Sequence, residues 1–162
     1  MVDGFLCQKQ QNMDIKEVKP INFLYLRSRA TLDQLDKFIP AGQRIYKEAV
    51  MNNLPITGPL QWHYFNFYGN PAEPFDLEVA LPVAVLPAEY DGEFHVKRTQ
   101  LFTCLSAMHY GDWNSITSTY GAMMKYAGSN GLKLSSHSRE IYNHVDFEDP
   151  SANVTEIQLG LG

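Results

Sequence analysis

Short apolar and aromatic segments, separated by turn residues, recur along the whole chain. Segments of this kind, rich in β-branched and aromatic residues and bounded by Gly, Pro, Asn or Asp, are typical of β-strands. On this basis we predict strands over residues 18–29, 60–68, 76–84, 98–110, 139–145 and 154–161. Residues 86–96 are polar and rich in turn formers, and we interpret them as a linker.

Two other segments carry helical signals. Thr31 is followed three residues later by Gln34, which is a capping-box pattern, and Pro40 suits the first turn of a helix because that turn needs no amide hydrogen. We therefore predict a short turn and then a helix over residues 40–52. Asp112 is a good N-cap for a second helix. The apolar side of that second helix is traced by Trp113, Ile116, Tyr120, Met123, Met124 and Ala127.

The same order of elements occurs twice, at a constant offset of 78 residues. An internal repeat should keep one offset across several elements. The matched pairs are Ala49 and Ala127, Leu54 and Leu132, Tyr64 and Tyr142, Glu78 and Glu156, and Leu81 and Leu159. We therefore predict an α+β fold made of a duplicated β-α-β-β module with pseudo-twofold symmetry. Its antiparallel sheet would carry two main helices on one side, with halves of about 14–86 and 94–162 after a flexible tail over 1–13.

Glutamates stand inside two of the predicted strands, where apolar residues are usual. Alternate residues of a strand face opposite sides of the sheet, so Glu156 should lie opposite Ile157 and Leu159, which would pack under a helix. By the same reasoning we place Glu140 and Tyr142 on the side away from the helices. Trp62 shares a face of its strand with Tyr64, and Glu78 lies opposite Leu77 and Val79.

These side chains could wall a cleft between the two halves. We expect its ligand-binding residues to be Glu156, Glu140, Tyr142, Trp62, Tyr64, Trp113 and Glu78. Aromatic faces attract cations by about 0.5–2 kcal/mol, and a partly desolvated carboxylate gains from pairing with one. The chemistry fits flat, apolar and often cationic molecules. The plainer alternatives are solvated strand glutamates and aromatic rings that belong to the core.

Charge and composition exclude several other functions. The chain of 162 residues has 13 Lys and Arg against 18 Asp and Glu, a net charge of -5, so we expect no direct nucleic-acid binding. We also expect no metal, because the five histidines show no ligand spacing, and no cofactor. Neither a signal peptide nor a membrane helix is indicated, and two cysteines in unrelated contexts fit a cytoplasmic protein. The oligomeric state is left open.

Four segments, taken together and in this order, resemble a known family. They are residues 58–83, 109–132, 138–145 and 153–161, which include "REIY" and "TEIQ". They are similar to the GyrI-like, or effector-binding, domain that occurs at the C-terminus of AraC- and MerR-type transcription regulators and also alone. The resemblance covers residues 14–162 and implies a duplicated β-α-β-β fold with a ligand cleft between the halves.

The resemblance also implies that Glu140 and Glu156 are the acidic residues of that cleft. In multidrug-sensing members such carboxylates meet cationic, lipophilic compounds. No helix-turn-helix segment precedes the domain in this sequence, so we do not expect direct transcription control. A related haem-binding group shares the fold, although no histidine here stands out as an axial ligand.

Three functions follow from these observations. The first is a stand-alone protein that senses or sequesters lipophilic, often cationic compounds. The second is a hydrolase of electrophilic, cyclopropane-containing toxic molecules, with Glu140 or Glu156 as the catalytic base that orients water. The third is an interaction protein similar to the family's DNA gyrase inhibitor. We place the binding function first, because catalysis requires a geometry that only a structure can show.

Overall fold

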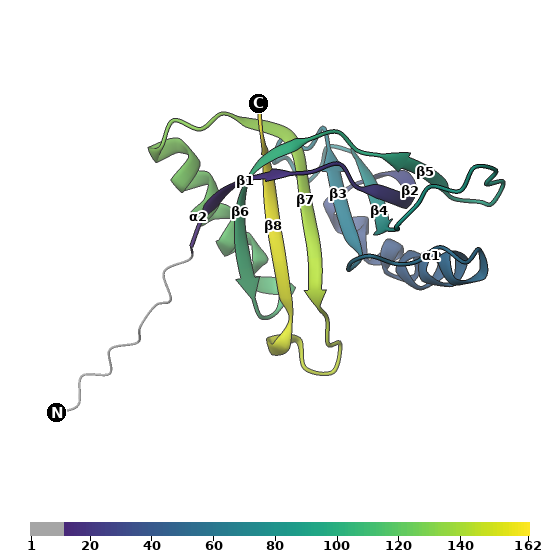
Figure 1. Ribbon diagram of the computed structural model, residues 1–162. Coiled ribbons are helices and arrows are strands. Elements are labelled where there is room, and N and C mark those ends of the chain that lie inside the picture. The colour runs from purple at the N-terminus through teal and green to yellow at the C-terminus, as the bar shows by residue number, and fades with distance from the viewer. Residues whose placement is uncertain (1–11) are drawn as a thin grey trace.

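The computed structural model describes residues 12–162, which form one eight-stranded antiparallel sheet with both main helices on the same face (Figure 1). The strands are β1 (Asp14–Val18), β2 (Asn22–Ala30), β3 (Gln61–Phe65), β4 (Phe75–Pro82), β5 (His95–Arg98), β6 (Phe102–Tyr110), β7 (Leu134–His144) and β8 (Val154–Leu161). The helices are α1 (Ile39–Met51) and α2 (Ile116–Ser129), with short 3-10 turns η1 (Leu32–Phe38), η2 (Trp113–Ser115) and η3 (Pro150–Ala152). Most of the predicted tail over 1–13 lies outside the described residues.

The strand order β1-β6-β8-β7-β3-β4-β2-β5 is symmetric about its centre. One unit, β2-α1-β3-β4, occupies one half of the sheet, and the other, β6-α2-β7-β8, occupies the other half in mirrored order. The central pair, β3 with β7, places Trp62 opposite Glu140, and these two residues are 78 positions apart. The predicted α+β fold with a duplicated β-α-β-β module is therefore confirmed.

Each helix forms because a stripe of small and apolar residues recurs every four positions. Ala41, Ile45 and Ala49 of α1 are buried in a core with Leu77 and other residues of β2, β3 and β4. In α2 the buried residues are Thr119, Met123 and Ala127, and Met123 and Ala127 share a second core with β6 and β8. Burying a side chain such as Ile45 stabilises the fold by about 1.5–3 kcal/mol. The helix predicted over 40–52 agrees with α1 to within one residue.

The two edge strands are exchanged between the halves. β1 precedes β2 in the chain but pairs with β6, while β5 precedes β6 but pairs with β2. The connecting segments meet at Ile21 and Thr99, again 78 residues apart: the Thr99 amide donates to the Ile21 carbonyl at 2.9 Å. The Ile21 amide donates to the Thr99 hydroxyl at 2.9 Å. Each half thus contributes a strand to the sheet of the other.

These edge strands were not predicted from the sequence. Residues 86–96 were predicted to be a linker, yet β5 begins at His95. One strand was predicted over residues 98–110, whereas in the structure β5 ends at Arg98 and β6 begins at Phe102. β1 was missed altogether. Both edge strands are four or five residues long, polar and largely exposed, so their pairing depends on partners distant in sequence rather than on a local apolar pattern.

The predicted faces of β7 were wrong. Register across the centre aligns Trp62 with Glu140, and Glu140 with Ile157, so all three side chains share the helix-covered face. Glu156 pairs with Ile141 and projects from the opposite face. Alternation along each strand was predicted correctly. Which residues of two neighbouring strands share a face depends on the register of the strands, however, and the sequence does not reveal that register. Glu140 and Glu156 therefore cannot meet in one cleft.

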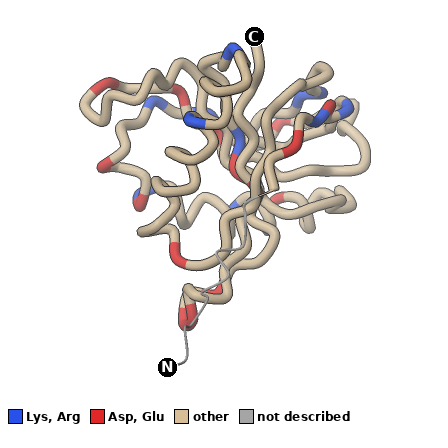
Figure 2. The backbone as a smooth tube through the Cα atoms, turned by 90° about the vertical axis from the view of Figure 1, so that its left-hand side faces the viewer, with Lys and Arg blue, Asp and Glu red and all other residues tan. Residues whose placement is uncertain are grey.

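Charged residues of both signs are interspersed along the backbone (Figure 2). Within residues 12–162 no helix is long and apolar enough to cross a membrane.

Candidate functional site

The carboxylate of Glu140 lies at the centre of the helix-covered face and accepts three tyrosine hydrogen bonds. Tyr64 of β3 donates to Oε1 at 3.0 Å, and Tyr142 of β7 donates to the same oxygen at 2.7 Å. Tyr120 of α2 donates to Oε2 at 2.5 Å. The site is thus assembled from both halves of the sheet and from the second helix. Oε2 keeps one acceptor position for a further donor.

Glu140 is buried, and no residue in the described part of the chain gives it a positive partner. Its exposed fraction is 7%, and none of the ion pairs among residues 12–162 includes it. Taking a carboxylate out of water is costly unless hydrogen bonds or a cation compensate it. Here the three hydroxyls supply that compensation. A cationic molecule that reached Glu140 would not compete with any cationic side chain of residues 12–162 for the carboxylate.

The tyrosines are held as neutral donors. Burial raises the pKa of Tyr64, Tyr120 and Tyr142 well above the usual value, and the negative charge of Glu140 raises it further. Each phenol therefore keeps its proton near neutral pH and directs it at the carboxylate. The geometry is consistent with a carboxylate held in one fixed orientation.

Two tryptophans extend the aromatic surface around this cluster. The ring of Trp62 packs edge-on against Tyr142 with centroids 6.0 Å apart, and the ring of Trp113 lies 5.4 Å from the same tyrosine. The Trp113 indole N–H donates to the Thr155 hydroxyl at 3.0 Å, which fixes the ring plane. Phe147 lies 6.0 Å from Trp113 and is 69% exposed, so the aromatic surface continues to the solvent.

Five of the seven sequence-predicted site residues come together here. They are Glu140, Tyr142, Trp62, Tyr64 and Trp113. Tyr120, which the helical pattern assigned to the core, is the member that sequence reasoning missed. Its helical position does face inward, but only the structure shows that its hydroxyl ends at a carboxylate.

Glu156 and Glu78 lie on the opposite face of the sheet and already have cationic partners. Lys16 of β1 approaches Glu156 to 2.9 Å. Glu78 is 2% exposed and pairs with Arg27 at 2.8 Å and with Lys97. The partner of Glu156 comes from β1, an edge strand, and Lys16 is 140 residues away from it in the chain.

The described part of the chain holds no group of three His, Cys, Asp or Glu residues placed to bind a metal ion. The thiol of Cys104 is buried, and burial raises its pKa to about 11. It is therefore protonated near neutral pH and a poor metal ligand or nucleophile.

Comparison with known proteins gives one family and several similar folds. The family model described as the GyrI-like small molecule binding domain matches residues 11–161. A search of curated proteins by sequence finds no significant match. The C-terminal domain of EcmrR is 20% identical, with a TM-score of 0.77 over 94% of this chain and 98% of that domain. The same fold makes up 57% of the longer EcmrR chain solved in a complex with DNA.

Two further similar structures are of a protein with a bound ligand and of a hydrolase. SAV2435, solved with bound tetraphenylphosphonium, is 12% identical, with a TM-score of 0.62 over 93% of this chain and 94% of that one. A hydrolase encoded by lin2189 from Listeria innocua is 14% identical, with a TM-score of 0.60 over 93% of this chain and 91% of that one. At these identities the likeness establishes the fold.

Proposed function

Because the chain belongs to the GyrI-like small-molecule-binding domain family, we propose that it binds lipophilic cations against Glu140. The observation that carries this proposal is the carboxylate itself, which is buried, held by three tyrosine hydroxyls and lacks a cationic partner among residues 12–162. A lipophilic cation would supply the missing positive charge and bury its rings against Trp62 and Trp113. The structure of SAV2435 with tetraphenylphosphonium supports this ligand class on the same fold.

Entry of a ligand requires one tyrosine to move. Tyr64 is buried, whereas Tyr120 and Tyr142 are half-buried. Tyr120 is attached to α2 and holds Oε2 alone, so we propose that its ring swings aside and that the ligand takes its place. The lost hydrogen bond, about 1.5–3 kcal/mol to a charged group, would be offset by the cation's charge and by cation-π contacts.

The charge requirement can be tested with two ions of the same shape. Tetraphenylphosphonium and tetraphenylborate carry the same four rings and opposite charges. Isothermal titration calorimetry should detect binding of the phosphonium and at least about tenfold weaker binding of the borate. Equal affinities would remove Glu140 from the proposal and leave only an apolar surface.

We propose that the protein senses or sequesters such compounds, in the cytoplasm. The net charge of -5 favours lipophilic cations as partners and disfavours nucleic acid. The EcmrR domain with the same fold is part of a chain solved in a complex with DNA, which is compatible with a sensing role for such domains.

A hydrolase is the second candidate, favoured by the free acceptor position on Glu140 Oε2 and by the similar fold of the lin2189 hydrolase. In this case Glu140 would take a proton from a water molecule that attacks an electrophilic cyclopropane carbon. A tyrosine hydroxyl would donate its proton to the carbon released as the ring bond breaks and recover a proton from protonated Glu140, so that water adds across that bond and both residues return to their starting state. Mass spectrometry of such a compound after incubation should then show a product 18 Da heavier that Glu140→Gln abolishes. Product formation that survives the substitution would exclude this mechanism.

A further inference from the structure

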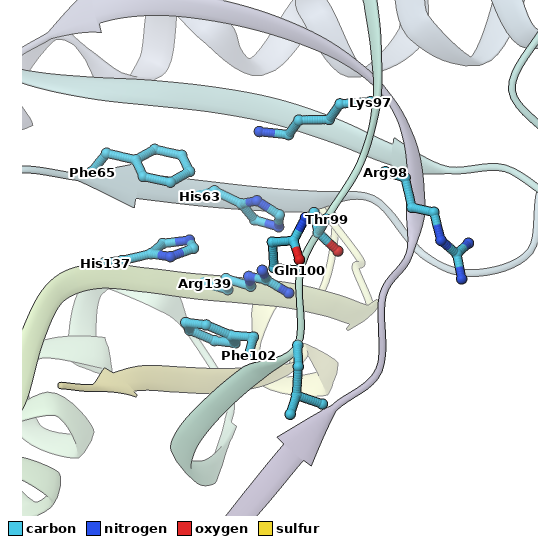
Figure 3. Close-up of a pocket in the computed structure, with 10 residues that line it drawn as sticks. His63, Phe65, Lys97, Arg98, Thr99, Gln100, Phe102, His137 and Arg139 are labelled. Atoms are coloured by element: carbon cyan, nitrogen blue, oxygen red, sulfur yellow. The ribbon is translucent and has the colours of Figure 1, made fainter.

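A pocket lies on the face of the sheet that carries no helix. Its volume is about 270 Å³, and the segment between β5 and β6 closes one side of it (Figure 3). The floor of the pocket is formed by β3 and β7 and includes His63 and Arg139. These two residues follow Trp62 and precede Glu140 in the chain, respectively, and their side chains point to the opposite face of the sheet. The sheet thus separates this pocket from the Glu140 cluster.

Arg139 is buried in this pocket and has no polar partner in the part of the chain that the structure describes. Its exposed fraction is 2%, its Nε has no hydrogen-bond partner, and no carboxylate among residues 12–162 forms an ion pair with it. Its guanidinium lies over the ring of Phe102, 3.9 Å from the centroid. Burial lowers its pKa to about 10, so the group is still charged near neutral pH. An unpaired charge at this depth is costly, and a bound anion would relieve it.

Glu78 is a buried carboxylate whose charge acts on Arg139, but it forms no ion pair with it. Glu78 is held instead by Arg27 and Lys97. None of the ten residues that line the pocket is acidic, although the chain as a whole is, and Lys97 and Arg98 add positive charge at its rim. The local charge is therefore positive, which attracts anions.

A second polar atom in the pocket is also unpaired. Nε2 of His137 is buried and has no hydrogen-bond partner within residues 12–162. Burial and the nearby Arg139 lower the pKa of His137 to about 3, so the ring is neutral and can donate a hydrogen bond from Nε2 in one tautomer. The His137 ring stacks on Phe65 at 4.2 Å and lies 4.6 Å from Phe102, which gives the pocket flat aromatic walls.

We propose that this pocket binds a small aromatic carboxylate, with the carboxylate on Arg139 and the ring packed against the wall formed by Phe65, His137 and Phe102. A planar guanidinium matches a carboxylate through two parallel hydrogen bonds, which favours this anion over a spherical one. A volume of about 270 Å³ lies just below the usual range for ligand pockets and limits the ligand to one or two rings. This site is independent of the Glu140 cluster and takes the opposite charge.

Benzoate and benzamide test the proposal on the unmodified protein. They have the same ring and nearly the same shape, but only benzoate carries a charge. Calorimetric titration should show benzoate binding, benzamide at least about tenfold weaker, and a shift of the Arg139 Nε–H resonance on adding benzoate. Equal binding of the two compounds, or benzoate binding without a shift of that resonance, would overturn the proposal.

Substitution of Arg139 provides a second test of the proposal. Arg139→Met should abolish benzoate binding, while Arg44→Met, the same change at an exposed arginine of α1 paired with Glu93, should leave it unchanged. Benzoate binding that survives Arg139→Met would contradict the site. Inorganic phosphate is the third probe, and displacement of benzoate by an equal concentration of phosphate would contradict the role assigned to the aromatic walls.

Discussion

Trp62 and Glu140 face each other across the central strand pair and occupy equivalent positions of the two halves, 78 residues apart. The pseudo-twofold axis therefore passes between them, and a second pair, Ile21 and Thr99, has the same separation where the edge strands cross. The repeat places a tryptophan in one half where the other has a carboxylate. The repeat thus makes the two halves structurally equivalent, but the two residues on the axis differ, so that the aromatic ring of Trp62 lies beside the carboxylate of Glu140.

The tyrosine hydroxyls around Glu140 should contribute to stability. Tyr142→Phe removes the 2.7 Å bond to Oε1 and leaves a buried carboxylate with one donor fewer. We expect a loss of about 1.5–3 kcal/mol in the free energy of unfolding, measured by urea denaturation. Tyr68→Phe is the matched control, because Tyr68 is 76% exposed and should change stability by less than about 0.5 kcal/mol. Equal effects would mean that the hydroxyls do not hold Glu140.

Two arginines on the helix-free face should respond in opposite ways. Arg27→Met removes a 2.8 Å ion pair to the buried Glu78 and should destabilise the protein by about 1–3 kcal/mol. Arg139→Met removes a buried charge that has no polar partner among the described residues and should leave stability unchanged or raise it. Both are measured by urea denaturation without added ligand. A large loss for Arg139→Met would reveal a partner for its guanidinium within the protein.

Gly160 allows β8 to pass close to β7 and β6. A Cβ at this position would lie 2.4 Å from the Ser135 hydroxyl, 2.6 Å from the His137 carbonyl and 2.9 Å from the Phe102 ring. Gly160→Ala should therefore lower the free energy of unfolding by about 1–3 kcal/mol. In α2, Gly128→Ala meets nothing within 4 Å and should be neutral or stabilising by up to about 1 kcal/mol. Thermal unfolding of both variants shows whether the loss in Gly160→Ala comes from steric overlap at that position or follows any replacement of a glycine by alanine.

Stability should fall as the pH is lowered through the histidine range. Burial, and then the charge of Arg139, lowers the pKa of His63 well below its usual value and that of His137 to about 3. The unfolded chain takes up these protons near pH 6.5 but the folded protein does not, so stability is complete above about pH 6.5. It should be lost progressively between about pH 6.5 and pH 3.

Urea denaturation at pH 7.5 and pH 5 measures this loss. His137→Gln should reduce the difference between the two pH values, whereas the same change at the exposed His144 should not. An unchanged difference in His137→Gln would show that His137 titrates alike in both states.

Sequence patterns identified the fold because the repeat preserves both element order and residue type. The constant offset of 78 anticipated that Tyr64 and Tyr142 are equivalent, and both donate to Glu140. The same patterns could not place Glu140, because its face depends on the register of β7 against its neighbours. They placed Glu156 on the correct face but could not identify its partner, because Lys16 belongs to a strand with no apolar signal. Nor could they find Arg139, whose significance rests on the absence of a partner within the described residues.

The affinity of tetraphenylphosphonium for three proteins tests the central claim most directly. Isothermal titration calorimetry would compare the unmodified chain with Glu140→Gln and with Glu156→Gln, two identical changes on opposite faces of one sheet. Circular dichroism spectra would confirm that all three are folded. We predict at least about tenfold weaker binding to Glu140→Gln and less than about twofold change for Glu156→Gln. Loss of binding in Glu156→Gln, with Glu140→Gln unaffected, would contradict the account.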